Sequence, residues 1–240
     1  MPSRPEASLA NEAYVAIREE ILRGLLRPGT PLSRRRLARE LKMSVVPVAD
    51  ALRRLEEDGL VESRARAGTR VKIPSASEVR ELYELREALE SQTARLFAER
   101  STAAERRTLR RLAQQLDAQF ARLASNGDDP VVRFAVHSEH VRLHLYIAEH
   151  SGSQLLKQMI ERKHVLILNW LFDVTGRRSA LPDGFHAALA EALTSGNPER
   201  ADAVMRTHVR YGLAEIAGRI GALAPSEWRE RRNKTAARLS

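Results

Sequence analysis

Three stretches of apolar residues at helical spacing lie close together near the start of the chain, and they most constrain what it can fold into. The first stripe begins at Leu9, runs to Leu25 and is stopped by Pro28 and the glycine after it. A second, short helix is expected after Ser33. A third is expected after Ser44, a residue type that caps helices. Three short helices in one block predict a small helical domain.

Two short strands are expected directly after the third helix, at Leu60–Ser63 and Thr69–Ile73. Gly68 lies in the loop between them and can adopt the positive φ that such turns often need. Three helices followed by a two-stranded wing form the layout of a winged helix-turn-helix, whose third helix enters the major groove of DNA. A second interpretation is a winged helix used for protein contacts.

The chain after Pro74 is helical in period throughout. Ser75 with Glu78, and Thr102 with Glu105, have the capping-box spacing that starts a helix. Further helices are expected from Pro130 to about His150 and over roughly 153–175, 182–195 and 198–221. The sequence therefore predicts a mainly α protein, in which the winged helix-turn-helix is followed by an all-α antiparallel helical bundle.

These patterns predict four parts of the chain. They are a flexible tail over 1–8, a DNA-binding winged helix-turn-helix over 9–75, an all-α ligand-binding and dimerisation domain over 76–222, and a basic C-terminal tail over 223–240.

Composition narrows the class of protein. Lys and Arg exceed Asp and Glu by five in residues 1–75, by one in 76–222 and by three in 223–240. This distribution favours a polyanion partner for the first segment, although a generally Arg-rich composition would also give a basic chain. There is no cysteine, so disulfides and thiolate-held metals are excluded. The longest apolar runs are too short to span a bilayer, and no secretory signal is visible, so we expect a cytoplasmic protein without membrane contact.

Basic and small residues collect on the expected recognition helix, on the helix before it and on the wing. The helix end offers free amides for a phosphate, and the wing arginines can reach the DNA backbone or the minor groove. The candidate DNA contacts are Arg34, Arg35, Arg36, Ser44, Val45, Val46, Ala49, Arg53, Arg64, Arg66, Gly68 and Arg70.

The segment LSRRRLARELKMSVVPVADALRRLEEDGLVESRARAGTRV resembles the winged helix of the GntR family of transcription regulators. The resemblance covers about residues 10–74 and implies sequence-specific binding to double-stranded DNA. Family members often carry DNA-contacting Arg at the positions of Val45 and Ala49, where this chain has small apolar residues. Val and Ala offer only van der Waals contact, for example to a thymine methyl group. The operator sequence therefore cannot be transferred from relatives.

Several histidines of the second half are candidates for a metal site. His140 and His144 are four residues apart and share one helical face, and His137 lies on nearly the same face. His186 and His208 stand at inward-facing positions of two later helices. Each could instead be a hydrogen-bonded core residue.

The segment VRELYELREALESQTARLFAER resembles the first helix of the FCD effector domain of the FadR-like subgroup, including the pattern of Leu82, Arg86 and Glu90. The later histidines follow the order of that domain's metal ligands. The resemblance implies a metal shell of His140, His144, His186 and His208, in which His137 is an alternative to His140.

A shell of neutral imidazoles suits zinc or nickel and brings no negative charge to offset the ion. An anionic effector is therefore expected at its open positions. Arg86 is the candidate to clamp the effector's carboxylate, unless it forms an ion pair with Glu90, four residues later.

We therefore predict a homodimeric transcription regulator, by resemblance a repressor, whose operator affinity responds to a small organic acid. One alternative is a DNA-binding dimer whose metal is structural or absent and which has no effector. Another is a zinc hydrolase, but the chain lacks a recognisable general base or any H-E-x-x-H or G-x-S-x-G motif, so an enzyme is not expected.

Overall fold

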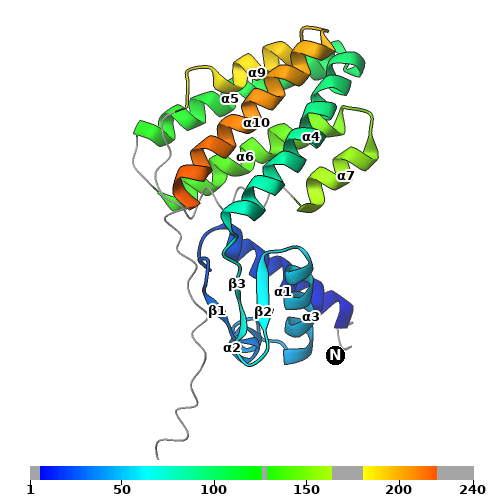
Figure 1. Ribbon diagram of the computed structural model, residues 1–240. Coiled ribbons are helices and arrows are strands. Elements are labelled where there is room, and N and C mark those ends of the chain that lie inside the picture. The colour runs from blue at the N-terminus through cyan, green and yellow to red at the C-terminus, as the bar shows by residue number, and fades with distance from the viewer. Residues whose placement is uncertain (1–5, 126–128, 164–180, 221–240) are drawn as a thin grey trace, which may run out of the picture. The chain divides into compact units, whose positions relative to one another are not determined.

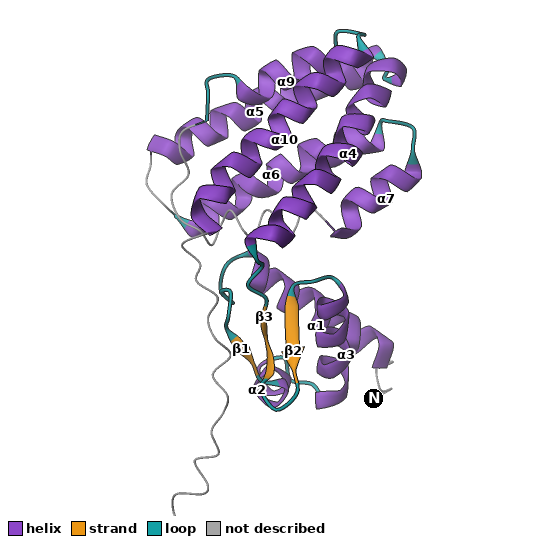
Figure 2. Ribbon diagram, viewed as in Figure 1, coloured by secondary structure: helices purple, strands orange, loops and turns teal. Residues whose placement is uncertain are grey.

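The computed structural model describes residues 6–125, 129–163 and 181–220, and these fall into two compact units that divide between Ile73 and Pro74. The fold is mainly helical, with a winged helix-turn-helix followed by an all-helical unit, as the sequence predicts (Figures 1 and 2). Among the described residues, no helix combines the length and apolar character needed to cross a bilayer.

The N-terminal unit contains α1 (Glu6–Leu22), α2 (Arg34–Glu40) and α3 (Val45–Glu57). Helix α1 packs on α3, and the core between these elements is apolar. It includes Ala13, Ile17, Val48, Leu52 and Leu55. The apolar stripe was expected to continue to Leu25, and this is wrong at its end. Helix α1 stops at Leu22, and Gly24 has a φ of 72°. Leu25 is therefore exposed, whereas Leu26 is buried.

The wing is a three-stranded antiparallel sheet in the order β1-β3-β2. The two expected strands appear as β2 (Val61–Arg64) and β3 (Gly68–Val71). Their bounds differ from the expectation, because Gly68 pairs with Arg64 as the first residue of β3 instead of lying in the loop, and β3 ends at Val71 instead of Ile73. The third strand, β1 (Pro31–Leu32), was not predicted, because two residues are too short to show alternation.

A half-buried network joins α1 to the C-terminal end of α3. The Tyr14 hydroxyl donates a hydrogen bond to Asp58 Oδ2 over 2.5 Å, and the Arg54 guanidinium lies 4.2 Å from the centre of the tyrosine ring. Burial and the contact with Asp58 raise the pKa of Tyr14 to about 12. The network therefore links α1 to the C-terminal end of α3.

We expect Tyr14→Phe to lower the free energy of unfolding by about 1.5–3 kcal/mol, the usual size for a hydrogen bond to a charged partner. Because folding raises this pKa, the stabilisation is complete below pH ~10 and is lost as the pH rises through the folded value. Urea unfolding and ultraviolet titration of the phenols measure both effects. Tyr211→Phe is the control, and a Tyr14→Phe variant that unfolds like the parent would contradict the expectation.

The second unit is all-helical over the residues that the structure describes. The bounds of its helices are α4 (Ala76–Arg100), α5 (Ala103–Ser125), α6 (Pro130–Glu149), α7 (Gln154–Lys163), α9 (Phe185–Leu193) and α10 (Pro198–Ile220). Ser75 and Glu78 form a reciprocal capping box at the start of α4, and Thr102 and Glu105 do the same at α5. The helix expected over 153–175 is described only as far as Lys163, and the tail over 223–240 lies outside the described residues.

Packing within this unit brings distant segments together. Helix α10 runs along α4, α5 contacts both α6 and α9, and α4 also contacts α6 (Figure 1). The fully buried side chains include Tyr83, Phe97, Leu109, Leu116 and Ile147. Helix α4 therefore packs against both α6 and α10 in the interior of this unit.

Candidate functional site

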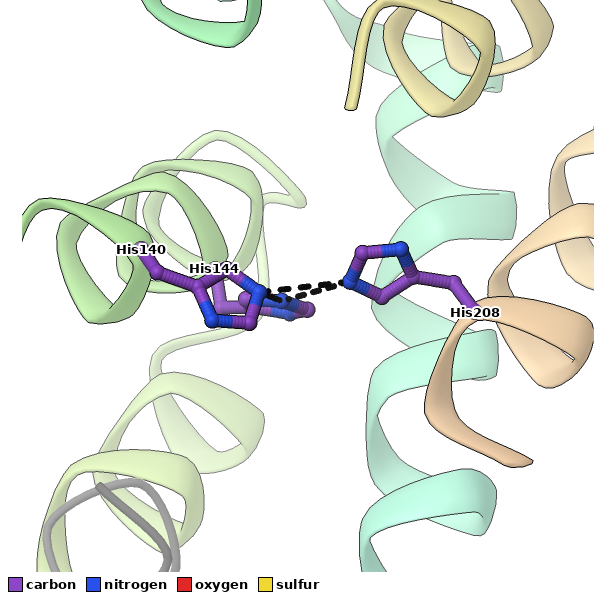
Figure 3. A group of neighbouring side chains, drawn as sticks. All are labelled: His140, His144 and His208. Atoms are coloured by element: carbon purple, nitrogen blue, oxygen red, sulfur yellow. Dashed lines mark hydrogen bonds between the residues drawn. The ribbon is translucent and has the colours of Figure 1, made fainter. Parts of the chain in front are cut away.

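Three histidines from two helices point at one another inside the second unit. His140 and His144 extend from α6 toward His208 on α10 (Figure 3). The Nε2 atoms are 2.9 Å apart between His140 and His144, 3.2 Å between His144 and His208, and 3.3 Å between His140 and His208. His144 and His208 are buried, and His140 is half-buried. The structure thus brings three of the four expected ligands to a common point.

The spacing of these nitrogens fits a shared ion. With bonds of 2.0–2.1 Å, two imidazole nitrogens on one ion lie about 2.9–3.4 Å apart, depending on the coordination geometry. The three observed separations fall in this range. Lone pairs that face one another at this distance repel unless a proton or a cation lies between them. The three-histidine cluster, His140, His144 and His208, could therefore hold a metal ion.

A buried carboxylate orients His144. Glu90 on α4 places Oε2 2.7 Å from His144 Nδ1. A carboxylate accepts the hydrogen at Nδ1, which leaves the lone pair on Nε2, where it faces the other two rings. Glu90 also accepts two hydrogen bonds from Arg86, at 2.6 Å from Nε and 3.3 Å from Nη2. Burial alone would raise the pKa of Glu90, but Arg86 and His144 hold that pKa far below its usual range.

Asp117 on α5 orients His186 in the same way, through a carboxylate contact to Nδ1. Its Oδ1 lies 2.6 Å from His186 Nδ1 and accepts the His186 amide, and its Oδ2 accepts the Ala187 amide at 2.9 Å. Burial would raise the pKa of Asp117, but the hydrogen bonds of His186 lower it. The carboxylate thus anchors the start of α9 and selects the His186 tautomer.

His186 lies beside the three-histidine cluster, but neither of its ring nitrogens belongs to the group of nitrogens that meet there. Its ring centre lies 5.0 Å from that of His140 and 5.5 Å from that of His208. His137 is buried edge-on against Phe120, 5.6 Å between ring centres. The structure therefore places His140, rather than the alternative His137, in the cluster.

Burial favours the neutral form of the His208 imidazole. The pKa of His208 is well below its ordinary value, chiefly because burial penalises the charged ring, and next because of the neighbouring His144. The ring also stacks on Phe185, with 4.6 Å between centres. A neutral imidazole is the form that binds a metal.

Two features of this site differ from the sequence expectation. We expected a shell of imidazoles with no negative charge nearby, but Glu90 and Asp117 place carboxylates against two of the imidazoles. Arg86 is buried, and two of its nitrogens donate to Glu90, which is the ion-pair interpretation of that residue. The spacing of Arg86 and Glu90 on one helical face was visible in the sequence, whereas nothing near Asp117 indicated its contact.

The candidate DNA-contacting residues lie on α2, on α3 and in the wing. Two of these residues, Ala49 and Arg70, are half-buried. The others are exposed, namely Arg34, Arg35, Arg36, Ser44, Val45, Val46, Arg53, Arg64, Arg66 and Gly68. Arg70 forms a cross-strand ion pair with Glu62 at 2.7 Å. Ser44 stands at the N-cap of α3 without a side-chain cap bond. Arg66 and Gly68 both have positive φ at the wing turn, 63° and 91°.

This combination of a winged helix-turn-helix and an all-helical unit with buried histidines is that of a two-part DNA-binding regulator. Residues 9–71 match the model for bacterial regulatory proteins of the gntR family, and residues 81–211 match the FCD domain. The chain belongs to the GntR family and carries an FCD domain, and the proteins of this family are DNA-binding transcription regulators rather than enzymes.

Relatives agree with this assignment. An uncharacterised helix-turn-helix regulator from Agrobacterium vitis is 37% identical over 92 residues, which span 38% of this chain and only about half, 54%, of that protein. A protein from Paenarthrobacter nicotinovorans, named "Probable D-xylose utilization operon transcriptional repressor", is 27% identical over 90% of this chain and 92% of its own. The crystal structure of a GntR regulator from Rhodococcus sp. RHA1 shares the fold, with a TM-score of 0.71 and 24% identity over 88% of this chain and 98% of that one.

Proposed function

We propose that the chain is a homodimeric repressor whose affinity for operator DNA is set by a small organic acid bound beside a divalent transition metal. His140, His144 and His208 would hold the ion, with His186 as the fourth imidazole. The observation that carries this proposal is the meeting of three Nε2 atoms within 2.9–3.3 Å of one another. A shared cation stabilises ring nitrogens that face one another at this distance, whereas without one their lone pairs repel.

The donor set favours zinc or nickel. Neutral imidazoles are borderline ligands that suit these ions better than calcium or magnesium. Carboxylates behind ligand imidazoles, as Glu90 stands behind His144 here, are the usual means of fixing the tautomer and raising ligand basicity. When bound, the ion supplies a Lewis-acidic position for an anionic oxygen.

Arg86 is the proposed second anchor for the acid. Its guanidinium is buried and donates to both oxygens of Glu90. A carboxylate effector would therefore gain Arg86 by exchanging with Glu90, one carboxylate for another. Such an exchange would also alter the contact that Glu90 makes with His144.

Repression and dimerisation are supported by the family and by DNA geometry. The Paenarthrobacter relative is named as a repressor. Winged-helix and related regulators bind as two-fold dimers to half-sites about one helical turn, ~34 Å, apart. An effector that alters the placement of two DNA-binding units would change operator occupancy.

The test is the affinity of the full chain for a labelled duplex from its own upstream region, measured by fluorescence anisotropy. Metal-free and zinc-loaded protein are compared, each with a panel of mono-, di- and tricarboxylates. We expect at least one acid to change the affinity of the zinc-loaded chain by roughly 5–150-fold, the usual range of allosteric coupling. His208→Ala should remove that response.

The second candidate function is a DNA-binding dimer with a structural metal or none. It predicts tight operator binding that no acid alters in either form of the protein. That result would overturn the sensing proposal and would leave the regulator assignment standing.

A further inference from the structure

The N-terminal edge of α3 presents apolar side chains to solvent. Val45 is 42% exposed and Val46 is 56% exposed, although both lie in the first turn of the helix. The core face of the same helix is formed by other residues, namely Pro47, Val48, Ala51, Leu52 and Leu55. Neither valine is therefore needed at its position to complete the core of the unit.

The position of the two valines, at the N-terminal end of α3, is the one that faces the major groove in a helix-turn-helix protein. In a helix-turn-helix protein, the N-terminal residues of the recognition helix are the ones that reach base edges in the major groove. Ser44, at the N-cap, makes no side-chain cap bond. The part of α3 that enters the groove first thus carries one hydroxyl group and two isopropyl groups.

The arginines of α3 lie further along the helix and have partners within the protein. Arg53 is eight residues beyond Val45, or about 12 Å along the axis, and pairs with Glu57. Arg54 donates to Asn11 and lies over the ring of Tyr14. An exposed pair such as the one of Arg53 is weak enough to exchange for a phosphate, so Arg53 is suited to the DNA backbone. The first turn of α3 carries no Arg, so it cannot recognise guanine through a guanidinium group.

We propose that Val45 and Val46 read thymine methyl groups in the major groove of the operator. Thymine is the base that presents a methyl group there, and apolar side chains contact it directly. The inference rests on the DNA-binding function of the winged helix and adds how sequence is read. Removing one such methyl group should weaken binding by roughly fourfold, the value of one buried methylene-sized group.

The experiment replaces thymine by deoxyuridine, which pairs identically and lacks only the C5 methyl group. The full chain first selects its preferred duplex from a random pool. Each thymine of the selected duplex is then changed to deoxyuridine, one at a time. We expect about fourfold weaker binding at one or two positions per half-site, and no change at the others.

Valine variants identify the residues responsible. Val46→Ser has a helix propensity close to that of Val but replaces the apolar methyl groups by a hydroxyl, and it should bring the ratio of thymine to deoxyuridine affinity close to one at its own position. Val45→Ser should do the same at a neighbouring position. Val15→Ser is the matched control, because Val15 is 48% exposed on α1, and it should leave every ratio unchanged. Circular dichroism checks that each variant is folded.

The outcomes are distinct. A chain that selects a duplex but binds every deoxyuridine version as tightly as the parent overturns the methyl readout and leaves DNA binding intact. Methyl dependence that persists at the same positions in Val45→Ser and Val46→Ser also overturns it, because another residue must then make the contact. A chain that selects no duplex overturns both this inference and DNA binding itself.

Discussion

A His208→Ala variant, purified without an affinity tag, is expected to lose its bound metal. His208 is the one member of the three-histidine cluster that α10 supplies, so the variant keeps only the two imidazoles of α6. Losing a contact behind a ligand already costs about 10–100-fold in metal affinity, so losing the ligand itself should cost more. Elemental analysis after dialysis, followed by zinc titration with a competing chelator, measures the loss.

His150→Ala is the matched control for this prediction. His150 follows the last turn of α6, is partly exposed and pairs with Glu105 at 3.1 Å, outside the cluster. This variant should retain the metal content of the parent chain. A His208→Ala protein that holds as much metal as the parent would show that the cluster is not the site.

Glu90→Gln is expected to cost about 3–5 kcal/mol of unfolding free energy in the metal-free chain. The change keeps the shape of the side chain but removes its charge, and Arg86 is then buried without its ion-pair partner. Breaking one side of a buried ion pair has this cost because the remaining charge stays desolvated. Urea unfolding of the chelator-treated protein measures the change.

Glu87→Gln on the same helix provides the control. Glu87 pairs with Arg206 and Arg210, whose side chains are 40% and 66% exposed, whereas Arg86 is buried. Exposed ion pairs contribute about 0–1 kcal/mol, so this variant should unfold close to the parent. Equal losses for the two variants would contradict the argument from burial.

The effect of Glu90→Gln should also depend on pH in a defined direction. Folding lowers the pKa of Glu90, so its contribution to stability is present above the unfolded value of ~4.3 and is lost as the pH falls toward the folded value. The difference between the parent chain and Glu90→Gln should therefore be full at pH 7 and should shrink on acidification below pH ~4. A difference that grows in acid would contradict the assigned charge state.

Much of the fold was predictable because its signals are local. The capping boxes at Ser75 and Thr102 start α4 and α5 through bonds within three residues of chain. Gly68 and the strands around it likewise form a local turn. The prediction was wrong for Leu25, because the positive φ of Gly24 ends the helical register before that residue, and an apolar stripe does not report where a helix stops.

The candidate site was only partly predictable. His140 and His144 are one helical turn apart, so their shared face follows from spacing alone. The contact of Asp117 with His186 joins α5 to α9 across 69 residues of chain, and no sequence period links the two. The contact of Glu90 with His144 likewise depends on how α4 packs against α6.

By itself, the sequence determined the helix periods, the wing, the order of the histidines and the apolar residues at the leading turn of α3, because each depends on neighbours along the chain. Only the tertiary structure decided that His208 reaches His144, 64 residues earlier, and that His186 stands beside the cluster. It also decided that Arg86 pairs with Glu90. The reason is physical: helix packing sets the distances between side chains on different helices, and the periodicity of one helix carries no information about the rotation of the next.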